Sequence, residues 1–528
     1  MKLLLILLVL FTGVLFRSSE CTQQAWLPSM LDSLANRTTQ LKHYIREKGK
    51  NFKLYSNKVQ SKFSSYFKST TAADTQSILS SAELGVTANP VDSLFNDVKI
   101  DILKGKKFNA KKPVEDLKLV RLPYLDKYVE EFLPLPRRKT KVEKCTSDCP
   151  LALLTTPQLI AANGYPAESH TVVTNDGYIL TVHRIPHAKS RLDKSVPFKT
   201  ALLHHGLLGS SADWVITGPR RALAYILADA GYDVWLANVR GNTYSRAHVN
   251  LTVDSVAFWN FTFHEVSQYD LPALIDHIMD VKGMDVKINY IGHSMGTTVL
   301  FALLSTKVHY NKVLRAGFAL APVAYMTNIR SPIRLLARFS NHISYLMKIL
   351  GANEFLPQSA VLRWLSKHAC EINNYEEVLC ENSLFVLCGN DEKQFNRTLM
   401  PILLNHVPAG ASTKTIIHYA QEIKNGGRFQ QFDYGPEGNL KQYGTSYPPI
   451  YEPSKITLPM ALFSAENDWL SGELDVANLY AELVNPIQHY IVPLKTFNHI
   501  DFLWAIDAPL LVYEKLLQLL EDVCGALG

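Results

Sequence analysis

From about residue 155 onward, short apolar runs alternate with segments whose apolar residues recur at helical spacing. Residues 172–185 predict a β-hairpin, because two alternating strands flank the turn residues Asn175, Asp176 and Gly177. Further strands are predicted at residues 200–204, 232–237 and 287–291, and helices at about 221–230 and 269–281. Strands that alternate with helices indicate parallel βαβ units. The sequence therefore predicts an α/β fold with a mostly parallel sheet.

The first residues of the chain follow a different pattern. Lys2 precedes an apolar run from Leu3 to Phe16, and polar residues follow. A positive charge before a short apolar stretch is typical of a secretory signal peptide, and the run is short for crossing a bilayer. We therefore expect residues 1–19 to be a signal peptide, with a signal anchor as the alternative. A chain with such a peptide is expected to be secreted or to reach the lumen of an organelle such as the lysosome.

Residues 20–150 form a basic extension. They carry 23 Lys and Arg against 15 Asp and Glu, whereas residues 151–528 carry 29 against 33. Between residues 40 and 68, apolar residues at helical spacing with lysines between them predict a basic amphipathic helix. Such a helix either packs on its own domain with a solvated basic face or makes a peripheral contact with an anionic membrane. Residues 69–95 read as a loose connection, and the basic run at 137–141 is either a processing site or a charged linker.

Several sequence patterns fit the secretory pathway. Seven cysteines leave at least one thiol free or pair Cys21 outside the chain, and the short loop between Cys370 and Cys380 favours a disulfide over buried thiols. Zinc-type cysteine and histidine spacings are absent, so neither a metal site nor a cofactor is expected, and secretion argues against nucleic-acid binding. Asn-X-Thr patterns predict glycosylation at Asn36, Asn250, Asn260 and Asn396.

The stretch from Gly292 to Gly296 has the pattern G-x-S-x-G around Ser294. Glycines on both sides allow the chain to turn sharply from a strand into a helix and leave the serine hydroxyl exposed at the edge of the sheet. A β-prone run precedes this stretch and an apolar helical run follows it. The pattern therefore predicts a nucleophilic serine, provided that the rest of the chain supplies its partners.

A glycine-containing loop follows the strand that ends at His204. Acyl transfer places negative charge on the former carbonyl oxygen, and two preorganised backbone N–H groups can stabilise it. In chains with such a serine turn, one donor is the residue directly after the nucleophile and the other lies in a loop of this kind. We assign these donors to Met295 and Leu207, and the alternative for the loop is an ordinary turn.

The general base and its acidic partner are expected after the serine, the acid first. An apolar strand ends at Asp468, and a second strand, predicted from His489, ends at His499. Because both ends deliver a polar residue to the same edge, we predict Asp468 as the acid and His499 as the base. Glu466 and Asp475 are the alternative acids. His489 would precede its strand and lie at the opposite edge.

Taken together, these segments resemble the acid lipase family, which includes gastric and lysosomal lipases. The resemblance covers roughly residues 155–525 and is specific because many segments occur in the same order. Besides the serine turn, it rests on residues 163–166, 176–180, 205–211, 235–242, 258–265, 269–273 and 498–502.

The resemblance implies an α/β-hydrolase core, with a mainly helical cap inserted at about residues 323–455, within a domain covering residues 151–528. It implies the triad Ser294, Asp468 and His499, and substrates that are neutral-lipid esters at a lipid–water interface. Cys370 and Cys380 are spaced like a bonded pair of the family, and Cys388 resembles its free thiol. The family usually has Gln where this chain has Met295, a change expected to alter the polarity of the pocket.

These observations predict a serine lipase or esterase that acts on triacylglycerol or sterol esters. Two rival hypotheses remain at this point. A non-catalytic lipid carrier could use the same fold, because a fold does not determine function. Another serine hydrolase, such as a thioesterase or peptidase, would share the triad.

Overall fold

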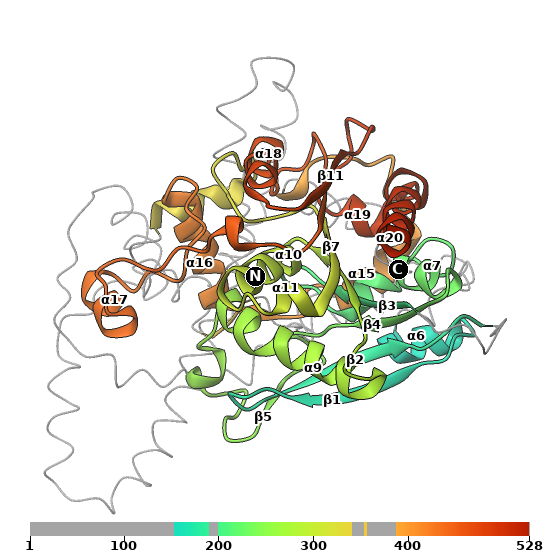
Figure 1. Cartoon of the computed structure of the whole chain (residues 1–528), viewed down its shortest axis with the longest axis horizontal. Helices are drawn as coiled ribbons and strands as arrows, with labels where there is room; N and C mark the ends of the chain where they lie inside the picture. Colours follow the sequence, from blue (N-terminus) through green and yellow to red (C-terminus); the bar gives the residue numbers. More distant parts are fainter. Residues whose placement is uncertain (1–152, 190–198, 340–352, 356–386, 527–528) are drawn as a thin grey trace, which may run out of the picture. The chain divides into compact units, whose positions relative to one another are not determined.

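The computed structural model describes residues 153–189, 199–339, 353–355 and 387–526 (Figure 1). The predicted signal peptide and basic extension, with Asn36, Cys370 and Cys380, lie outside the described residues. The division into signal peptide, extension and one hydrolase domain therefore stays a prediction. Within the described ranges, no helix is both long and apolar enough to cross a membrane.

A mixed, mostly parallel sheet forms the centre of the described part. Its strand order is β1-β2-β4-β3-β6-β7-β10-β11, with β5 paired to β2. All neighbours from β4 to β11 along this order are parallel, whereas β2 runs antiparallel to both β1 and β4. The strands are β1 (Glu168–Val173), β2 (Tyr178–Ile185), β3 (Lys199–His204), β4 (Tyr232–Leu236), β5 (Ala247–His248), β6 (Ile288–His293), β7 (Leu314–Leu320), β10 (Met460–Ser464) and β11 (Pro486–Ile491). The predicted hairpin and mostly parallel sheet are confirmed.

Some helices pack on the sheet, and others, such as α17, lie away from it (Figure 1). The α-helices are α6 (Thr156–Ala162), α7 (Leu223–Asp229), α8 (Phe263–Glu265), α9 (Leu271–Lys282), α10 (Met295–Thr306), α11 (Tyr310–Val313), α15 (Met400–His406), α16 (Thr413–Lys424), α17 (Pro436–Tyr443), α18 (Glu473–Glu482), α19 (Asp501–Trp504) and α20 (Glu514–Ala526). Short 3-10 helices are η3 (Ser211–Trp214), η4 (Val256–Trp259), η6 (Pro332–Phe339), η7 (Arg397–Leu399) and η8 (Pro453–Lys455), and single π-turns are η5 (Val266–Asp270) and η9 (Pro509–Tyr513).

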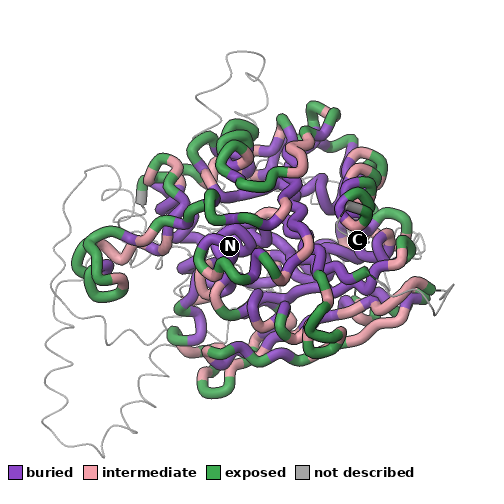
Figure 2. Tube along the Cα trace, in the orientation of Figure 1, coloured by how far each residue is buried: buried purple, intermediate pink, exposed green. Residues whose placement is uncertain are grey.

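Alternate residues of the strands belong to two hydrophobic cores, one on each face of the sheet. On β3, Leu203 packs in the core that includes α7 and α20, whereas Leu202 packs in the core that includes α9 and α10. On β10, Phe463 and Leu462 divide in the same way. Because side chains alternate across a strand, a strand covered on both faces is a continuous apolar run. Figure 2 shows these strands buried and the outer loops exposed.

The parallel strands bring distant loops to one edge of the sheet. His204 at the end of β3 pairs with Gly292 near the end of β6, and Ser464 at the end of β10 pairs with Ile491 at the end of β11. Since the strands are parallel, the loops that follow their carboxyl ends meet at the same edge. This edge carries the predicted site residues.

The predicted cap, residues 323–455, is described only in part. The described pieces are η6, α15, α16 and α17 with the short strands β8 (Glu354–Phe355) and β9 (Ala411–Ser412), which pair with each other. Helix α16 packs against η6. Residues 340–352 and 356–386 lie outside the described part. A single inserted cap therefore stays a prediction.

Candidate active site

Ser294 lies in a strained turn between β6 and α10. Its φ of 52° with ψ of −119° is a backbone conformation that residues other than glycine rarely adopt. A Cβ at Gly296 would collide with the carbonyl oxygen of His204, and one at Gly292 would lie 2.9 Å from the carbonyl carbon of Gly296. The Ser294 N–H donates to the carbonyl oxygen of Leu320 at 3.1 Å. Both glycines are thus needed for the strand to pass into the helix at this serine.

The imidazole of His499 lies between Ser294 and Asp468. Its Nε2 is 2.8 Å from the Ser294 Oγ, and its Nδ1 is 2.8 Å from one carboxylate oxygen of Asp468 and 3.0 Å from the other. A carboxylate can only accept, so Nδ1 carries the proton and the Nε2 lone pair faces the serine hydroxyl. His499 is therefore placed to take a proton from Ser294.

Backbone N–H groups fix the carboxylate of Asp468. Its Oδ1 accepts hydrogen bonds from the N–H groups of Leu470 at 2.8 Å and Ser471 at 2.7 Å. The side chain is fully buried. These bonds hold the carboxylate in a single orientation toward His499.

The two alternative acids do not reach His499. Glu466 is exposed to solvent. Asp475, in α18, accepts hydrogen bonds from the backbone N–H and the side-chain amide of Asn328, both at 2.7 Å. The structure thus brings together Ser294, Asp468 and His499 rather than either alternative.

A short segment at residues 388–390 connects the loop that carries Asp468 with the loop that carries His499. Its backbone carbonyl groups accept hydrogen bonds from both loops. The carbonyl oxygen of Cys388 accepts from the backbone N–H groups of Trp469 at 3.2 Å and His499 at 3.4 Å. The side-chain amide of Asn498 donates to the carbonyl oxygen of Gly389, and that of Asn467 donates to the carbonyl oxygen of Asn390, both at 2.9 Å. The acid, the base and this segment are therefore held as one unit.

Neighbouring histidines support the site without titrating near neutral pH. Burial lowers the pKa of His293 to about 3 and that of His205 to about 4. Neutral His293 donates from Nε2 to the carbonyl oxygen of His499 at 2.8 Å. His489 does not precede its strand as expected: β11 begins at Pro486, and His489 lies within it, 2.8 Å from the Ser464 hydroxyl.

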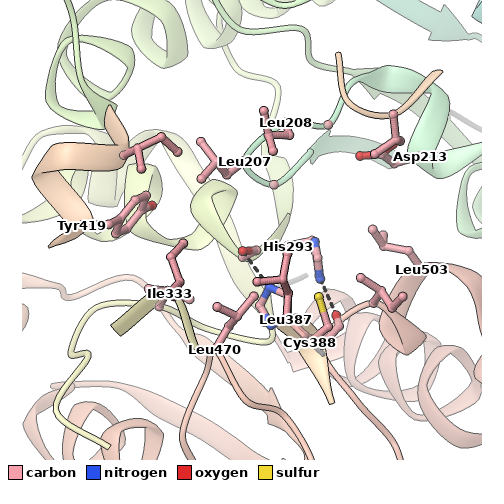
Figure 3. Close-up of a pocket in the computed structure, with 18 of the residues that line it drawn as sticks. Leu207, Leu208, Asp213, His293, Ile333, Leu387, Cys388, Tyr419, Leu470 and Leu503 are labelled. Carbon is pink, nitrogen blue, oxygen red and sulfur yellow. Dashed lines mark hydrogen bonds between the residues drawn. The ribbon is translucent and has the colours of Figure 1, made fainter. Parts of the chain in front are cut away.

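A cavity of about 210 Å³ opens beside Ser294 and His499. Its wall is almost entirely apolar. Figure 3 shows side chains from the loop after β3, from η6, from α16 and from α19 around it. The apolar lining includes Leu207, Leu208, Ile333, Tyr419, Leu470 and Leu503. Such a cavity suits a hydrocarbon chain next to the serine hydroxyl.

The loop after β3 lies directly against the serine. A Cβ at Gly206 would be 3.0 Å from the Cβ of Ser294, so only glycine allows this approach without displacement. Leu208 adopts a φ of 63°, and its carbonyl oxygen accepts from the Ala409 N–H at 2.7 Å. Met295 is the first residue of α10, where backbone N–H groups have no partner within the helix. The assignment of Leu207 and Met295 as oxyanion donors stays a prediction that this placement supports.

Met295 borders a different cavity from the large one beside Ser294. Met295 is buried and borders a small second cavity together with Arg240, Phe261 and Thr415, and it does not line the large cavity. A helix turns by about 100° per residue, so neighbouring positions on α10 face different surroundings. The structure gives no support to the expectation that this residue alters the polarity of the pocket.

Two buried carboxyl groups near the site were not predicted from the sequence. Burial raises the pKa of Asp213 to about 7. Burial also raises the pKa of Asp501 to about 8, and the nearby carboxyls of Asp391 and Asp468 add to this, although the Asn498 N–H donates to Asp501 at 2.7 Å. The short spacing from Asn498 to Asp501 is typical of a local turn, but burial of the carboxyl group cannot be read from it.

The raised pKa of Asp501 predicts that stability falls as pH rises. The folded chain holds this proton more tightly than the unfolded chain, so unfolding releases it between about pH 4 and pH 8. Replacing Asp501 by Asn keeps an acceptor for Asn498 and removes the ionisation. The quantity to compare is the free energy of unfolding of Asp501→Asn minus that of the wild type. We expect this difference to be more favourable to the variant at pH 7.5 than at pH 4.5, by about 1–3 kcal/mol.

Urea denaturation at the two pH values measures this difference. Asp507→Asn, in the same segment, is the matched control, because the carboxylate of Asp507 is exposed to solvent whereas that of Asp501 is buried. A stability difference between Asp501→Asn and wild type that does not depend on pH would contradict the prediction.

The remaining predicted residues are surface sites and cysteines. Asn250 and Asn260 are exposed and Asn396 is partly exposed, so glycosylation stays a prediction at each. Cys388 is a buried free thiol that lines the large cavity. Within the described ranges, no group of three or more His, Cys, Asp or Glu side chains is arranged to hold a metal ion.

Comparison with known proteins agrees with the α/β fold. A family model described as a partial alpha/beta-hydrolase lipase region matches residues 156–218, and one described as alpha/beta hydrolase fold matches residues 200–334. Gastric triacylglycerol lipase of Bos taurus is 40% identical over 375 residues, which cover 71% of this chain and 92% of that protein.

Two further relatives extend the match. Lysosomal acid lipase/cholesteryl ester hydrolase of Homo sapiens is 38% identical over 379 residues, covering 72% of this chain and 93% of that protein. Lipase lipl-1 of Caenorhabditis elegans is 38% identical, covering 70% of this chain and 92% of that protein. With the α/β sheet, this degree of identity shows that the chain belongs to the acid lipase family of the gastric and lysosomal lipases.

Proposed function

We propose that this ester-hydrolysing enzyme is a serine lipase that cleaves neutral-lipid carboxylic esters through an acyl-enzyme. The observation that carries the proposal is the imidazole of His499, hydrogen-bonded to both Ser294 and Asp468 at the wall of an apolar cavity. A nucleophile, a base and an orienting acid within hydrogen-bond distance are the elements that acyl transfer requires.

In the first half of the reaction, the Ser294 Oγ attacks the ester carbonyl carbon while its proton passes to the His499 Nε2. The carbonyl oxygen becomes negatively charged and accepts from the backbone N–H groups of Leu207 and Met295. When the bond to the alcohol breaks, His499 returns the proton to the leaving oxygen. The acyl group then remains on Ser294.

The second half repeats these steps with water. A water molecule gives a proton to His499 and attacks the acyl carbon, and His499 then returns the proton to the Ser294 Oγ as the acid product leaves. Asp468 keeps the Nδ1–H of His499 in place and stabilises the imidazolium that forms twice per cycle. The chain's own residues thus complete the cycle.

The apolar wall indicates the class of substrate. A long acyl chain can replace water along the cavity, whereas a peptide would leave its backbone hydrogen-bonding groups unpaired there. The relatives are named for triacylglycerol and cholesteryl ester hydrolysis. We propose triacylglycerol or sterol esters for this chain, at a lipid–water interface.

We also propose where the protein acts and what its N-terminal extension does. Residues 1–19 act as a signal peptide that sends the chain to the secretory pathway or to lysosomes, where Asn36, Asn250, Asn260 and Asn396 receive glycans. Residues 20–150 then precede the hydrolase domain of residues 151–528. The basic amphipathic segment predicted within them supplies a peripheral contact with lipid, with packing on its own domain as the alternative, and secretion argues against nucleic-acid binding.

Titration with a fluorophosphonate probe, combined with a panel of esters, tests this function. We expect about one probe molecule per chain to stop hydrolysis of long-chain triacylglycerol or sterol ester emulsions, because the probe occupies Ser294. A carrier protein would bind lipid without taking up the probe. A thioesterase would take up the probe but leave the emulsions intact, and either result would refute the proposal.

A further inference from the structure

One carboxyl group lies in the wall of the otherwise apolar cavity. Asp213, the third residue of η3, is only 3% exposed and lines the cavity beside the loop after β3. In the view of Figure 3, Asp213 and Leu503 lie on one side of His293, and Tyr419 and Ile333 lie on the other. The acid therefore belongs to one end of the space next to the reacting serine.

Only one oxygen of this carboxyl group has a structural role. The Oδ2 of Asp213 accepts from the Ser210 N–H at 3.3 Å and so caps η3. The Oδ1 is buried and has no hydrogen-bond partner among the described residues. Gly209 packs against the carboxyl group so closely that a Cβ there would collide with it. The loop thus fixes the carboxyl group but leaves half of its hydrogen-bonding capacity unused.

A second unpaired polar group lies in the same wall. Trp504, the last residue of α19, is 5% exposed and also lines the cavity. Its Nε1–H has no hydrogen-bond partner among the described residues. Helix α19 packs against η3, so Trp504 and Asp213 come from neighbouring elements. An indole N–H only donates, whereas a carboxyl oxygen accepts, so the two groups are complementary to a ligand that does both.

We propose that Asp213 and Trp504 form a polar subsite for a hydroxyl group of the ester substrate. The proposal rests on the function proposed above. A hydroxyl group donates one hydrogen bond and accepts others, which matches one carboxyl oxygen and one indole N–H. Burial raises the pKa of Asp213 to about 7; below that pH Oδ1 carries the proton and donates, because Oδ2 accepts from Ser210, and above that pH Oδ1 accepts. A hydroxyl group fits both forms, because it accepts from the neutral acid and donates to the carboxylate. The subsite then selects among apolar esters by a single polar group.

This hydroxyl group has two sources. It belongs either to a hydroxylated acyl chain or to the alcohol part of a partial glyceride. Sites that hydrogen-bond a substrate hydroxyl discriminate against the analogue that lacks it, because their own polar groups then stay unpaired. Matched pairs of esters that differ only in this hydroxyl therefore test both sources.

The first comparison tests the acyl chain as the source of the hydroxyl. It uses 4-nitrophenyl esters of fatty acids of one chain length, which are either unsubstituted or hydroxylated at successive carbons. The second compares dioctanoylglycerol with the dioctanoyl ester of propane-1,2-diol, which lacks the free hydroxyl. We expect kcat/KM of the wild type to be at least about tenfold higher for the hydroxylated member of one pair. The pair that shows this preference identifies the source of the hydroxyl.

Three variants locate the preference. We expect Asp213→Leu to bring the ratio of kcat/KM between paired esters to about one, and Trp504→Phe to lower it. Asp213→Asn should retain much of it, since an amide also donates and accepts. Leu503→Met changes the same wall without changing polarity, so it should keep the wild-type ratio. A loss of folded enzyme cancels in these ratios, and if Asp213→Leu does not fold, the other two variants still decide.

Two outcomes would overturn the subsite. One is a wild-type ratio within twofold of one in both pairs, and the other is a preference that persists unchanged in Asp213→Leu or Trp504→Phe. If the wild type hydrolyses no ester at all, the proposed lipase function fails instead.

Discussion

Replacing Ser294 by alanine should lower kcat for ester hydrolysis by roughly 10⁵–10⁶-fold, because the group that attacks the carbonyl is removed. The fold should remain, since the Ser294 Oγ faces His499 at the cavity rather than the hydrophobic core. The backbone strain at this position also remains, so stability should change little. Rates with a soluble short-chain ester, together with the thermal midpoint of the purified variant, measure both effects. Labelling by a fluorophosphonate should disappear with activity.

Ser305 provides a matched control in the same helix. Its hydroxyl donates to the carbonyl oxygen of Ala302 at 3.2 Å, far along α10 from the turn. Ser305→Ala should therefore keep both activity and labelling. If Ser294→Ala retained more than about a hundredth of the wild-type rate while folded, another group would have to be the nucleophile.

Replacing Asp468 by asparagine should lower kcat by about 10⁴-fold without displacing the loop. The amide oxygen can keep the bonds from the N–H groups of Leu470 and Ser471, so the NH₂ group is left to face His499. His499 would then accept at Nδ1 and carry its proton on Nε2, the tautomer that cannot take a proton from Ser294. Pre-steady-state acylation with a chromogenic ester measures this loss directly.

Asp475→Asn is the corresponding control, because Asp475 is also a buried acid and was an alternative partner for His499. Its loss should weaken the bonds to Asn328 and lower stability, while kcat of the folded fraction should stay close to that of the wild type. Reversal of the two results, with Asp475→Asn inactive and Asp468→Asn active, would reassign the acid.

The sheet and the serine turn could be predicted because their signals are local. Strand periodicity and the glycines around Ser294 determine conformation over a few residues. The partners at Asp468 and His499 followed from one topological rule, that parallel strands end at the same edge. Helix α9 (Leu271–Lys282) continues directly from α8 and the π-turn η5, so the helical segment predicted at about residues 269–281 begins earlier, at Phe263.

The parts that escaped prediction depend on packing between distant segments. Nothing near Asp213 in the sequence shows that α19 will cover η3 and leave its carboxyl group buried in a cavity wall. The direction of the Met295 side chain depends on how α10 is rotated against its neighbours, and that was not available from a motif. The strand that contains His489 was placed too late because its apolar residues do not mark its first half.

The bonds from residues 388–390 to the two catalytic loops restrict how a lipid can enter. Moving this segment would break four hydrogen bonds at once and shift Asp468 and His499 with it. We therefore do not expect a bulky ester to enter by displacing the wall at Cys388, because that movement would break the hydrogen bonds that position the acid and the base. The start of η6 is tied to the loop that carries the acid, because Arg330 donates to the carbonyl oxygen of Asp468 at 3.2 Å. We therefore expect the cavity to widen on the side of α16, where the hydroxyl of Tyr419 donates to Thr298 at 3.1 Å rather than to the acid or the base.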